Sequence, residues 1–384
     1  MNERVAIIGI GYTQLRPLSP DVSFREMIYE AAVKAYNDAG IEPKDVDTFV
    51  AISEDYNEGT AIFDEYVPDQ IGAVLKPVHT ITQDAITAIS ACVMQIKTGI
   101  FNIAVLEGHS KASNILYPSH IEAFALDPIS IRPLGFNPLF LAGLEMQRFL
   151  LERGCNEYHC ALVVSKNKKN AMKNPIAAYP GEISISDVLS SNPVSFPLKE
   201  LDISKRADGA FVIILARESI AKKLSDKPVY IEGIGWCQET PNIEKRDLVN
   251  ALYLTYAANM AYSQAGIRNP LKEIDFAEID DTFSYKELQH IEALGISRSG
   301  ESGNMLEEGY FDFDGELPVN VSGGSLGCGN LYDANGLRGI CEAVLQLREE
   351  AGERQIPACE IGLVASWKGL PSASGGVLIL SNRE

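Results

Sequence analysis

Two adjacent carboxylates, Asp280 and Asp281, are the residues of this sequence that point most directly to acid–base chemistry. A carboxyl group that loses its contact with water holds its proton to higher pH, so a partly desolvated Asp280 would suit a general base. The alternative is that Asp281 has a structural role and Asp280 is solvated. Two tyrosines, Tyr285 and Tyr332, offer hydroxyl groups that can act as donors or acids.

The sequence lacks the signatures of several other enzyme classes. Gly9 and Gly11 are not followed by the third glycine of a dinucleotide-binding fingerprint, and neither a phosphate-binding loop nor a nucleophile elbow is present. The 5 histidines include no pair at metal-ligand spacing, so we expect no metal site. The 7 cysteines are scattered and odd in number, and no secretory signal is recognisable, which predicts reduced thiols in a cytoplasmic protein.

The balance of charge is strongly acidic. With 33 Lys and Arg against 52 Asp and Glu, the formal net charge is −19, which argues against nucleic-acid and anionic-membrane binding. Apolar runs are also too short for a membrane span. One basic cluster stands out and is a candidate docking site for a polyanionic ligand, although a solvated basic face fits it too. Its members are Lys166, Lys168, Lys169 and Lys173.

The chain contains an internal repeat. A Gly-Ile-Gly motif at residues 9–11 returns 224 residues further on, and an alanine-rich segment returns after 226 residues. The segments that would close each copy also match. Three matches in the same order indicate two copies of one fold. The matching segments are 5–14 and 229–238, 31–41 and 257–267, and 207–218 and 373–384.

Short apolar runs alternate with amphipathic helical patterns in each copy. Apolar residues at helical spacing predict a helix over residues 24–39 that ends at Gly40. Alternating elements predict an α/β fold with mainly buried sheets and helices on both faces. We therefore divide the chain into two halves, residues 1–224 and 225–384, and assign an inserted lobe to about 110–205 of the first half.

Four stretches of the sequence resemble the thiolase superfamily, and most of all its archaeal and lipid-transfer (sterol-carrier-protein) type members. They are residues 166–175, 183–202, 207–210 and 320–348. The resemblance spans nearly the full length of the chain. It implies a thiolase fold, in which two duplicated halves form a five-layered αβαβα arrangement with an inserted loop lobe.

The resemblance also implies that the usual catalytic residues are absent. Thiolases attack an acyl-CoA thioester with a cysteine at a helix N-terminus, helped by two histidines or by a histidine and an asparagine. The nucleophile position falls on Thr82, and the two histidine positions fall on Asp280 and Asn330. On its own, the chain should therefore not be a conventional thiolase. Cys328, in a glycine-rich loop, is a possible substitute nucleophile, and a packed thiol is the alternative.

Coenzyme A thioester is the substrate or ligand that this resemblance implies, with no permanently bound cofactor. Coenzyme A is a polyanion, so the lysine cluster at residues 166–173 becomes the expected CoA-binding site. Asp280, acting as a general base, would suit retro-aldol or Claisen-type chemistry without an acyl-enzyme.

Three functional hypotheses follow. In the first, the protein makes or breaks a carbon–carbon bond of an acyl-CoA within a multi-subunit complex, as an acyltransferase or aldolase. In the second, it is a catalytically inactive thiolase-like subunit that supports an active paralogue. In the third, it carries acyl-CoA or lipid without chemistry. The resemblance implies a homodimer, or a heterodimer with a thiolase paralogue, and a possible OB-fold/zinc-ribbon partner protein.

Overall fold

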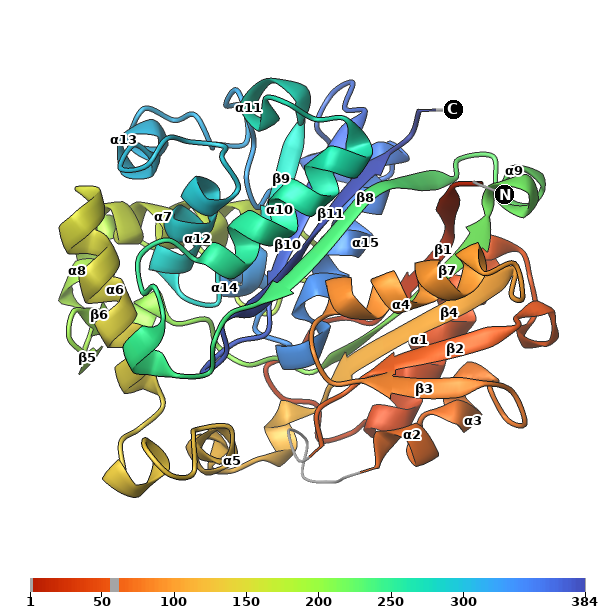
Figure 1. The fold of residues 1–384 in the computed structure, drawn as a ribbon, viewed down its shortest axis with the longest axis horizontal. Coiled ribbons are helices and arrows are strands. Elements are labelled where there is room, and N and C mark those ends of the chain that lie inside the picture. Colours follow the sequence, from red (N-terminus) through yellow and green to blue (C-terminus); the bar gives the residue numbers. More distant parts are fainter. Residues whose placement is uncertain (1–2, 56–61, 384) are drawn as a thin grey trace.

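The computed structural model describes residues 3–55 and 62–383, and a nine-stranded mixed sheet runs through this part of the chain (Figure 1). The strand order is β3-β2-β4-β7-β1-β8-β11-β10-β9, so each half of the sequence supplies one end of the sheet. The strands are β1 (Val5–Tyr12), β2 (Thr48–Ile52), β3 (Val78–Ile81), β4 (Ile103–Ser110), β7 (Gly209–Arg217), β8 (Val229–Gln238), β9 (Phe276–Ile279), β10 (Ile361–Trp367) and β11 (Ser374–Ser381).

The two ends of the sheet repeat one topology. In the N-terminal half, β4 pairs in parallel with β2 and antiparallel with β7, which pairs antiparallel with β1. In the C-terminal half, β10 pairs in parallel with β9 and antiparallel with β11, which pairs antiparallel with β8. The halves meet at a short antiparallel contact, where Ala6 faces Tyr230 and Ile7 faces Val229. The duplication predicted from the sequence is confirmed.

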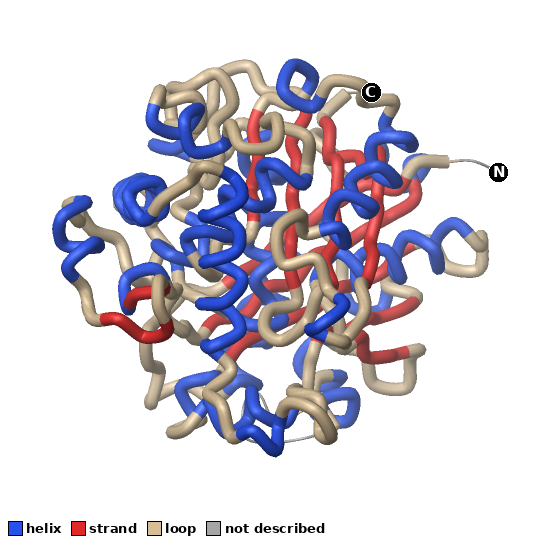
Figure 2. The backbone as a smooth tube through the Cα atoms, turned by 60° about the vertical axis from the view of Figure 1, so that its left-hand side comes forward, coloured by secondary structure: helices blue, strands red, loops and turns tan. Residues whose placement is uncertain are grey.

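Two helices, α4 (Ala85–Lys97) and α15 (Asn335–Leu347), fill the layer between the two halves of the sheet. Their apolar side chains share one core with strands from both halves. The outer faces are covered by α1 (Phe24–Ala39) in the N-terminal half and by α10 (Leu252–Ala265) in the C-terminal half. Figure 2 shows most strands in the interior with helices on both sides. This is the predicted five-layered αβαβα arrangement.

The predicted insertion between β4 and β7 is largely helical. Its helices α6 (Leu139–Arg153) and α7 (Glu157–Ala171) pack against α12 (Ser284–Ala293). Helix α7 also packs against α13 (Ser302–Glu307) and α14 (Gly324–Cys328), so the lobe lies mainly on the C-terminal half (Figure 1). The lobe contains α5 (Pro118–Phe124), α6 (Leu139–Arg153), α7 (Glu157–Ala171), α8 (Ile185–Ser190) and the hairpin of β5 (Pro193–Ser195) and β6 (Leu198–Lys199).

The remaining helices are short connections around the two halves. No α-helix within the described ranges is long and apolar enough to span a membrane. The remaining α-helices are α2 (Phe63–Tyr66), α3 (Pro68–Ile71), α9 (Glu218–Leu224), α11 (Pro270–Glu273), α12 (Ser284–Ala293), α13 (Ser302–Glu307) and α14 (Gly324–Cys328). The 3₁₀ helices are η1 (Pro43–Asp45), η2 (Ala112–Asn114), η3 (Arg132–Leu134), η4 (Glu200–Asp202), η5 (Ile243–Lys245), η6 (Tyr332–Ala334) and η7 (Gly352–Arg354).

Local sequence explains the bounds of α1. The Ser23 hydroxyl accepts a hydrogen bond from the Glu26 N–H, and the Glu26 carboxylate accepts one from the Ser23 N–H, which is the reciprocal arrangement of a capping box. At the other end, Gly40 adopts a φ of 65°, a left-handed conformation that glycine reaches without steric cost. The observed bounds match the predicted residues 24–39.

Small residues let the outer helices approach the sheet closely, and the same pairs recur in both halves. A Cβ atom on Gly11 of β1 would lie 2.1 Å from the carbonyl oxygen of Ala31 in α1. A Cβ atom on Gly235 of β8 would lie 1.9 Å from the carbonyl oxygen of Ala257 in α10. Both distances are far below van der Waals contact, so both strands need glycine at this point.

We expect Gly235→Ala to lower the free energy of unfolding by about 1–3 kcal/mol, because the added methyl group must push α10 away from β8. Gly181→Ala is the matched control, since a Cβ atom there would meet no atom within 4 Å. Denaturant unfolding of both variants checks this expectation. Equal stability of Gly235→Ala and the parent protein would contradict the close packing.

Candidate active site

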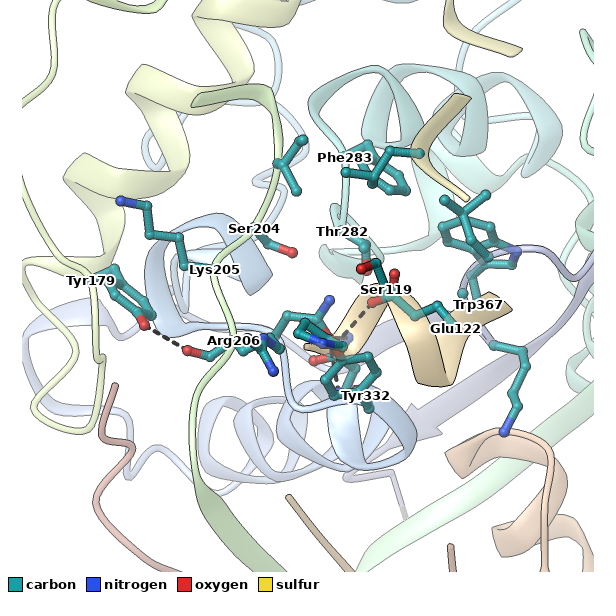
Figure 3. Close-up of a pocket in the computed structure, with 18 of the residues that line it drawn as sticks. Ser119, Glu122, Tyr179, Ser204, Lys205, Arg206, Thr282, Phe283, Tyr332 and Trp367 are labelled. Carbon is teal, nitrogen blue, oxygen red and sulfur yellow. Dashed lines mark hydrogen bonds between the residues drawn. The ribbon is translucent and has the colours of Figure 1, made fainter. Parts of the chain in front are cut away.

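A cavity of about 500 Å³ lies where the inserted lobe meets the two halves (Figure 3). Helix α5 of the lobe contributes part of the lining, and residues 203–206 contribute another part. The floor comes from Thr282 and Phe283, which follow β9, and from the loop that precedes α15. Residues 367–370, at the end of β10, complete the cavity.

A glutamate and a tyrosine form a hydrogen-bonded pair inside this cavity. The Tyr332 hydroxyl donates to Glu122 Oε1 at 3.2 Å, although the two residues are 210 positions apart (Figure 3). Burial raises the pKa of Glu122, against the smaller opposing effects of Tyr332 and Arg206. Tyr332, which lines the cavity, has a φ of 50°, a left-handed conformation that is strained for a tyrosine.

Asn330 presents an oriented amide group to the same cavity. Its Oδ1 accepts hydrogen bonds from the Tyr332 N–H and from Asn335 Nδ2, both at 2.9 Å. Two donors at Oδ1 fix the orientation of the amide. Its Nδ2 group has no acceptor within residues 3–55 and 62–383, so it can donate to a ligand.

Asp280 lies one layer behind the cavity wall. Its carboxylate accepts hydrogen bonds from the Thr282 N–H at 3.1 Å and from the Thr282 hydroxyl at 3.3 Å. Thr282 lines the main cavity, whereas Asp280 lines a separate space of about 10 Å³. Burial raises the pKa of Asp280 to about 7, and the neighbouring Asp281 charge contributes in the same direction. The desolvation of Asp280 agrees with the general-base hypothesis. Because Asp280 does not line the main cavity, however, a proton could reach its carboxylate from there only through Thr282.

Thr82, where the sequence predicts the family's nucleophile position, is exposed and does not line the cavity. The N-terminus of α4 is instead capped by Asp84. One carboxylate oxygen of Asp84 accepts a hydrogen bond from the Thr87 N–H at 2.9 Å, and the other accepts one from the Ser366 hydroxyl. A carboxylate therefore occupies the position where a thiolate would profit from the helix dipole.

Cys328 lies in the core and not in the cavity wall. Its Sγ–H donates to the carbonyl oxygen of Ser322 at 3.1 Å, and Sγ accepts from Asn174 Nδ2 at 3.5 Å. Burial raises the pKa of this thiol to about 12, so almost no thiolate exists at neutral pH. The position fits the packed-thiol alternative.

The four lysines of the predicted CoA-binding cluster do not form one surface patch. The Lys166 side chain is 7% exposed, and its Nζ contacts Glu287 Oε1 at 3.1 Å. Lys168 is buried and donates to the carbonyl oxygens of Leu326 and Tyr179. Lys169 and Lys173 are exposed, and none of the four lines the cavity.

Asp281 and Tyr285, the remaining residues that the sequence suggested for acid–base chemistry, make contacts that stabilise the fold. Asp281 is fully buried and accepts hydrogen bonds from the Ser325 and Leu326 N–H groups, which fastens α14 to the end of β9. Tyr285 is also fully buried, and its hydroxyl donates to Glu145. The described ranges contain no group of three or more His, Cys, Asp and Glu side chains that could hold a metal ion.

Several residues that line the cavity are not among the site residues predicted from the sequence. Glu122 belongs to the lobe, which has no counterpart in the other half, so the repeat could not point to it. Lys205 and Arg206 directly precede the Ala-Asp-Gly stretch at 207–209 that carries part of the family resemblance. That adjacency was the available signal, because loops beside shared motifs commonly reach the site.

The fold is that of a protein built on two thiolase-like halves, and comparison with known proteins supports this. The Thiolase C-terminal domain-like family matches residues 235–382. Acetyl-CoA acetyltransferase of Methanothermobacter thermautotrophicus is 32% identical over 373 residues, covering 95% of this chain and 96% of that protein. Sterol carrier protein 2 of Bos taurus is 28% identical over 94% of this chain and 70% of its own length.

Among solved structures, the Ltp2-ChsH2(DUF35) aldolase superposes with a TM-score of 0.85 at 23% identity, covering 99% of this chain and 98% of that one. The chain belongs to the thiolase superfamily.

Proposed function

We propose that the protein binds an acyl-CoA thioester and makes or breaks a carbon–carbon bond by aldol-type chemistry, without an acyl-enzyme. The observation that carries this proposal is the content of the cavity. It holds the Glu122–Tyr332 pair and the Asn330 amide, and no cysteine is among the described residues that line it. A thiolase cycle needs a thiolate, whereas an aldol cycle needs an acid–base pair and an oxyanion donor.

The geometry supports a simple sequence of steps in the cleavage direction. Tyr332 accepts the proton of the substrate β-hydroxyl while its own phenolic proton passes to Glu122. The β-oxygen becomes a carbonyl, the Cα–Cβ bond breaks, and the electron pair moves into the thioester as an enolate. Asn330 Nδ2 donates to the thioester oxygen, where the negative charge develops. The proton on Glu122 returns through Tyr332 to the α-carbon, which releases the shortened acyl-CoA.

Consumption of free CoA separates this reaction from thiolysis. The purified protein, with any partner that copurifies, is incubated with 3-hydroxyacyl-CoA esters of increasing chain length. Aldol cleavage yields an aldehyde or ketone and a shorter acyl-CoA while free thiol stays constant. If the protein instead cleaves a 3-oxoacyl-CoA and consumes one CoA for each bond broken, the proposal is wrong.

The rim of the cavity, rather than residues 166–173, is the CoA phosphate site that we propose. Lys205 is exposed at this rim. Arg206 Nη1 donates to two carbonyl oxygens of the lobe, those of Ala112 and Ile115. Lys368 also lines the cavity, but it is paired with Glu54 and Asp333. Burial alone would lower the pKa of Lys368, yet these carboxylates raise it. A lysine that forms a Schiff base with a carbonyl substrate needs a neutral amine, so the raised pKa argues against that role for Lys368.

We expect Lys205→Ala to weaken CoA binding by roughly 2- to 5-fold, the usual worth of one exposed charge. The effect should shrink at high salt, because exposed charges are screened. Lys169→Ala removes another exposed lysine, which lies outside the cavity, and should leave the affinity for CoA unchanged. Calorimetric titration with CoA at two ionic strengths measures both. If Lys169→Ala lost more affinity for CoA than Lys205→Ala, residues 166–173 would be favoured as the CoA phosphate site.

A non-catalytic subunit of a thiolase assembly is the second candidate function. The exposed Thr82 and the Asp84 cap favour it, because neither would support thiolysis. The similar solved structure of the Ltp2-ChsH2(DUF35) aldolase also favours a complex, because its name joins two components. We therefore propose a dimer, with itself or a thiolase paralogue, and a smaller OB-fold/zinc-ribbon partner. Activity that appears only when an intact paralogue is added would support this candidate.

A further inference from the structure

One serine in the cavity wall has a buried hydroxyl group without a hydrogen-bond partner. Ser204 is 5% exposed and lines the cavity. Within the described part of the chain, its Oγ has neither donor nor acceptor. A buried hydroxyl normally finds a partner, because leaving it unsatisfied costs free energy. Such a group inside a binding cavity suggests that the ligand supplies the missing partner.

The backbone holds Ser204 between the two segments where this chain departs from the thiolase pattern. The Ser204 N–H donates to the carbonyl oxygen of Thr282 at 2.9 Å, on the segment that follows Asp280. The next residue accepts a hydrogen bond from the Asn330 N–H through its carbonyl oxygen, at 2.7 Å. Figure 3 shows the Ser204 side chain pointing toward the middle of the cavity, between Lys205 and Thr282.

We infer that the Ser204 hydroxyl binds the thioester carbonyl oxygen of the acyl-CoA, as a second donor beside Asn330 Nδ2. This inference rests on the proposed function and names a residue that the proposal does not include. A serine hydroxyl rotates about a single side-chain torsion with three staggered positions, so it can follow a ligand with little rearrangement. Two donors at one oxygen stabilise the enolate more than one does, because the charge develops at that oxygen.

The lack of a partner argues against a structural role for the Ser204 hydroxyl. A serine hydroxyl that stabilises the fold would donate a hydrogen bond to another group of the protein, as the Ser284 hydroxyl does to Asp202. Replacing Ser204 by alanine removes a group that bonds to no described residue, so the thermal stability of the free protein should not fall. A loss of stability would show that the hydroxyl has a partner within the protein.

Two ligands that differ only in the carbonyl group test the inference. Calorimetric titration is carried out with acetyl-CoA and with S-ethyl-CoA, a thioether that lacks the carbonyl oxygen. We expect Ser204→Ala to weaken acetyl-CoA binding by roughly 2- to 10-fold, the usual worth of one hydrogen bond, and to leave S-ethyl-CoA binding unchanged. Ser204→Thr keeps a hydroxyl and should recover part of the loss.

Ser119→Ala is the matched control, because Ser119 also lines the cavity but belongs to α5 of the inserted lobe. It should change the affinities for the two ligands equally or not at all. The inference is overturned if the ratio of the two affinities is the same in Ser204→Ala and the parent protein. A parent protein that binds neither ligand would overturn the proposed function itself, which is a distinct result.

Discussion

Tyr332→Phe should lower the rate of carbon–carbon bond cleavage by roughly 10²–10⁴-fold, the usual contribution of a general acid–base group. The substitution removes one oxygen atom, and with it the donor that contacts Glu122 at 3.2 Å. Binding of acyl-CoA should change little, because the aromatic ring remains in the cavity wall. Steady-state kinetics and calorimetric titration of the same preparation separate the two effects.

Glu122→Gln is the companion variant, and it tests whether Glu122 is the group that accepts the proton from Tyr332. Burial raises the pKa of Glu122, and the mechanism needs its ionised form. The rate of the parent protein should therefore fall as pH decreases through this raised pKa, which lies above the ordinary value of glutamate. Glu122→Gln should be slow at every pH and should lose this acidic limb. An unchanged limb in Glu122→Gln would assign the titration to another group, such as Asp280.

Lys166→Met should lower the free energy of unfolding by about 3–5 kcal/mol, because it leaves the buried Glu287 carboxylate without its cation. The Lys166 side chain is 7% exposed, and that of Glu287 is fully buried. The Glu287 carboxylate also accepts hydrogen bonds from Asn167 and Asn320, which hold it in place. Denaturant unfolding measures the loss.

Lys169→Ala is the control on the same helix, since Lys169 is exposed, and it should be nearly neutral. The double variant Lys166→Met/Glu287→Gln should recover part of the stability, because no unpaired charge remains buried. A Lys166→Met protein that is fully stable but binds CoA weakly would restore the predicted role of Lys166 in CoA binding.

The duplicated core could be predicted from the sequence because the packing that forms it leaves a local trace. Gly11 with Ala31, and Gly235 with Ala257, are small because a helix contacts a strand at each point. The repeat preserves both the residues and their spacing. Alternating apolar runs gave the order of the elements, and Ser23 and Gly40 marked the ends of α1.

The lysine cluster illustrates why the site was harder to predict. Residues 166–173 are polar enough to suggest a solvated face, yet α7 packs against α12 and α14. The side chains of Lys166 and Lys168 turn into this interface, where they donate to the carbonyl oxygens of Val319 and Leu326. The spacing of lysines in the sequence does not show which of them donate hydrogen bonds to backbone groups that are distant in the sequence.

The Glu122–Tyr332 pair could not be predicted for a related reason. Its two members come from the inserted lobe and from the loop before α15, and only the folded chain brings them together. Tyr332 was recognised as a hydroxyl donor from its place beside an altered motif. Its partner, which would make it an acid–base group, has no sequence signal.

The central claim is that the carbon–carbon bond breaks without a covalent acyl-enzyme. Intact-protein mass spectrometry during turnover of a 3-hydroxyacyl-CoA tests it most directly, with the products quantified in the same samples. We predict that the mass of the chain stays unchanged while shorter acyl-CoA accumulates. A mass increase equal to an acyl group, mapped to a cysteine such as Cys328, would contradict the account.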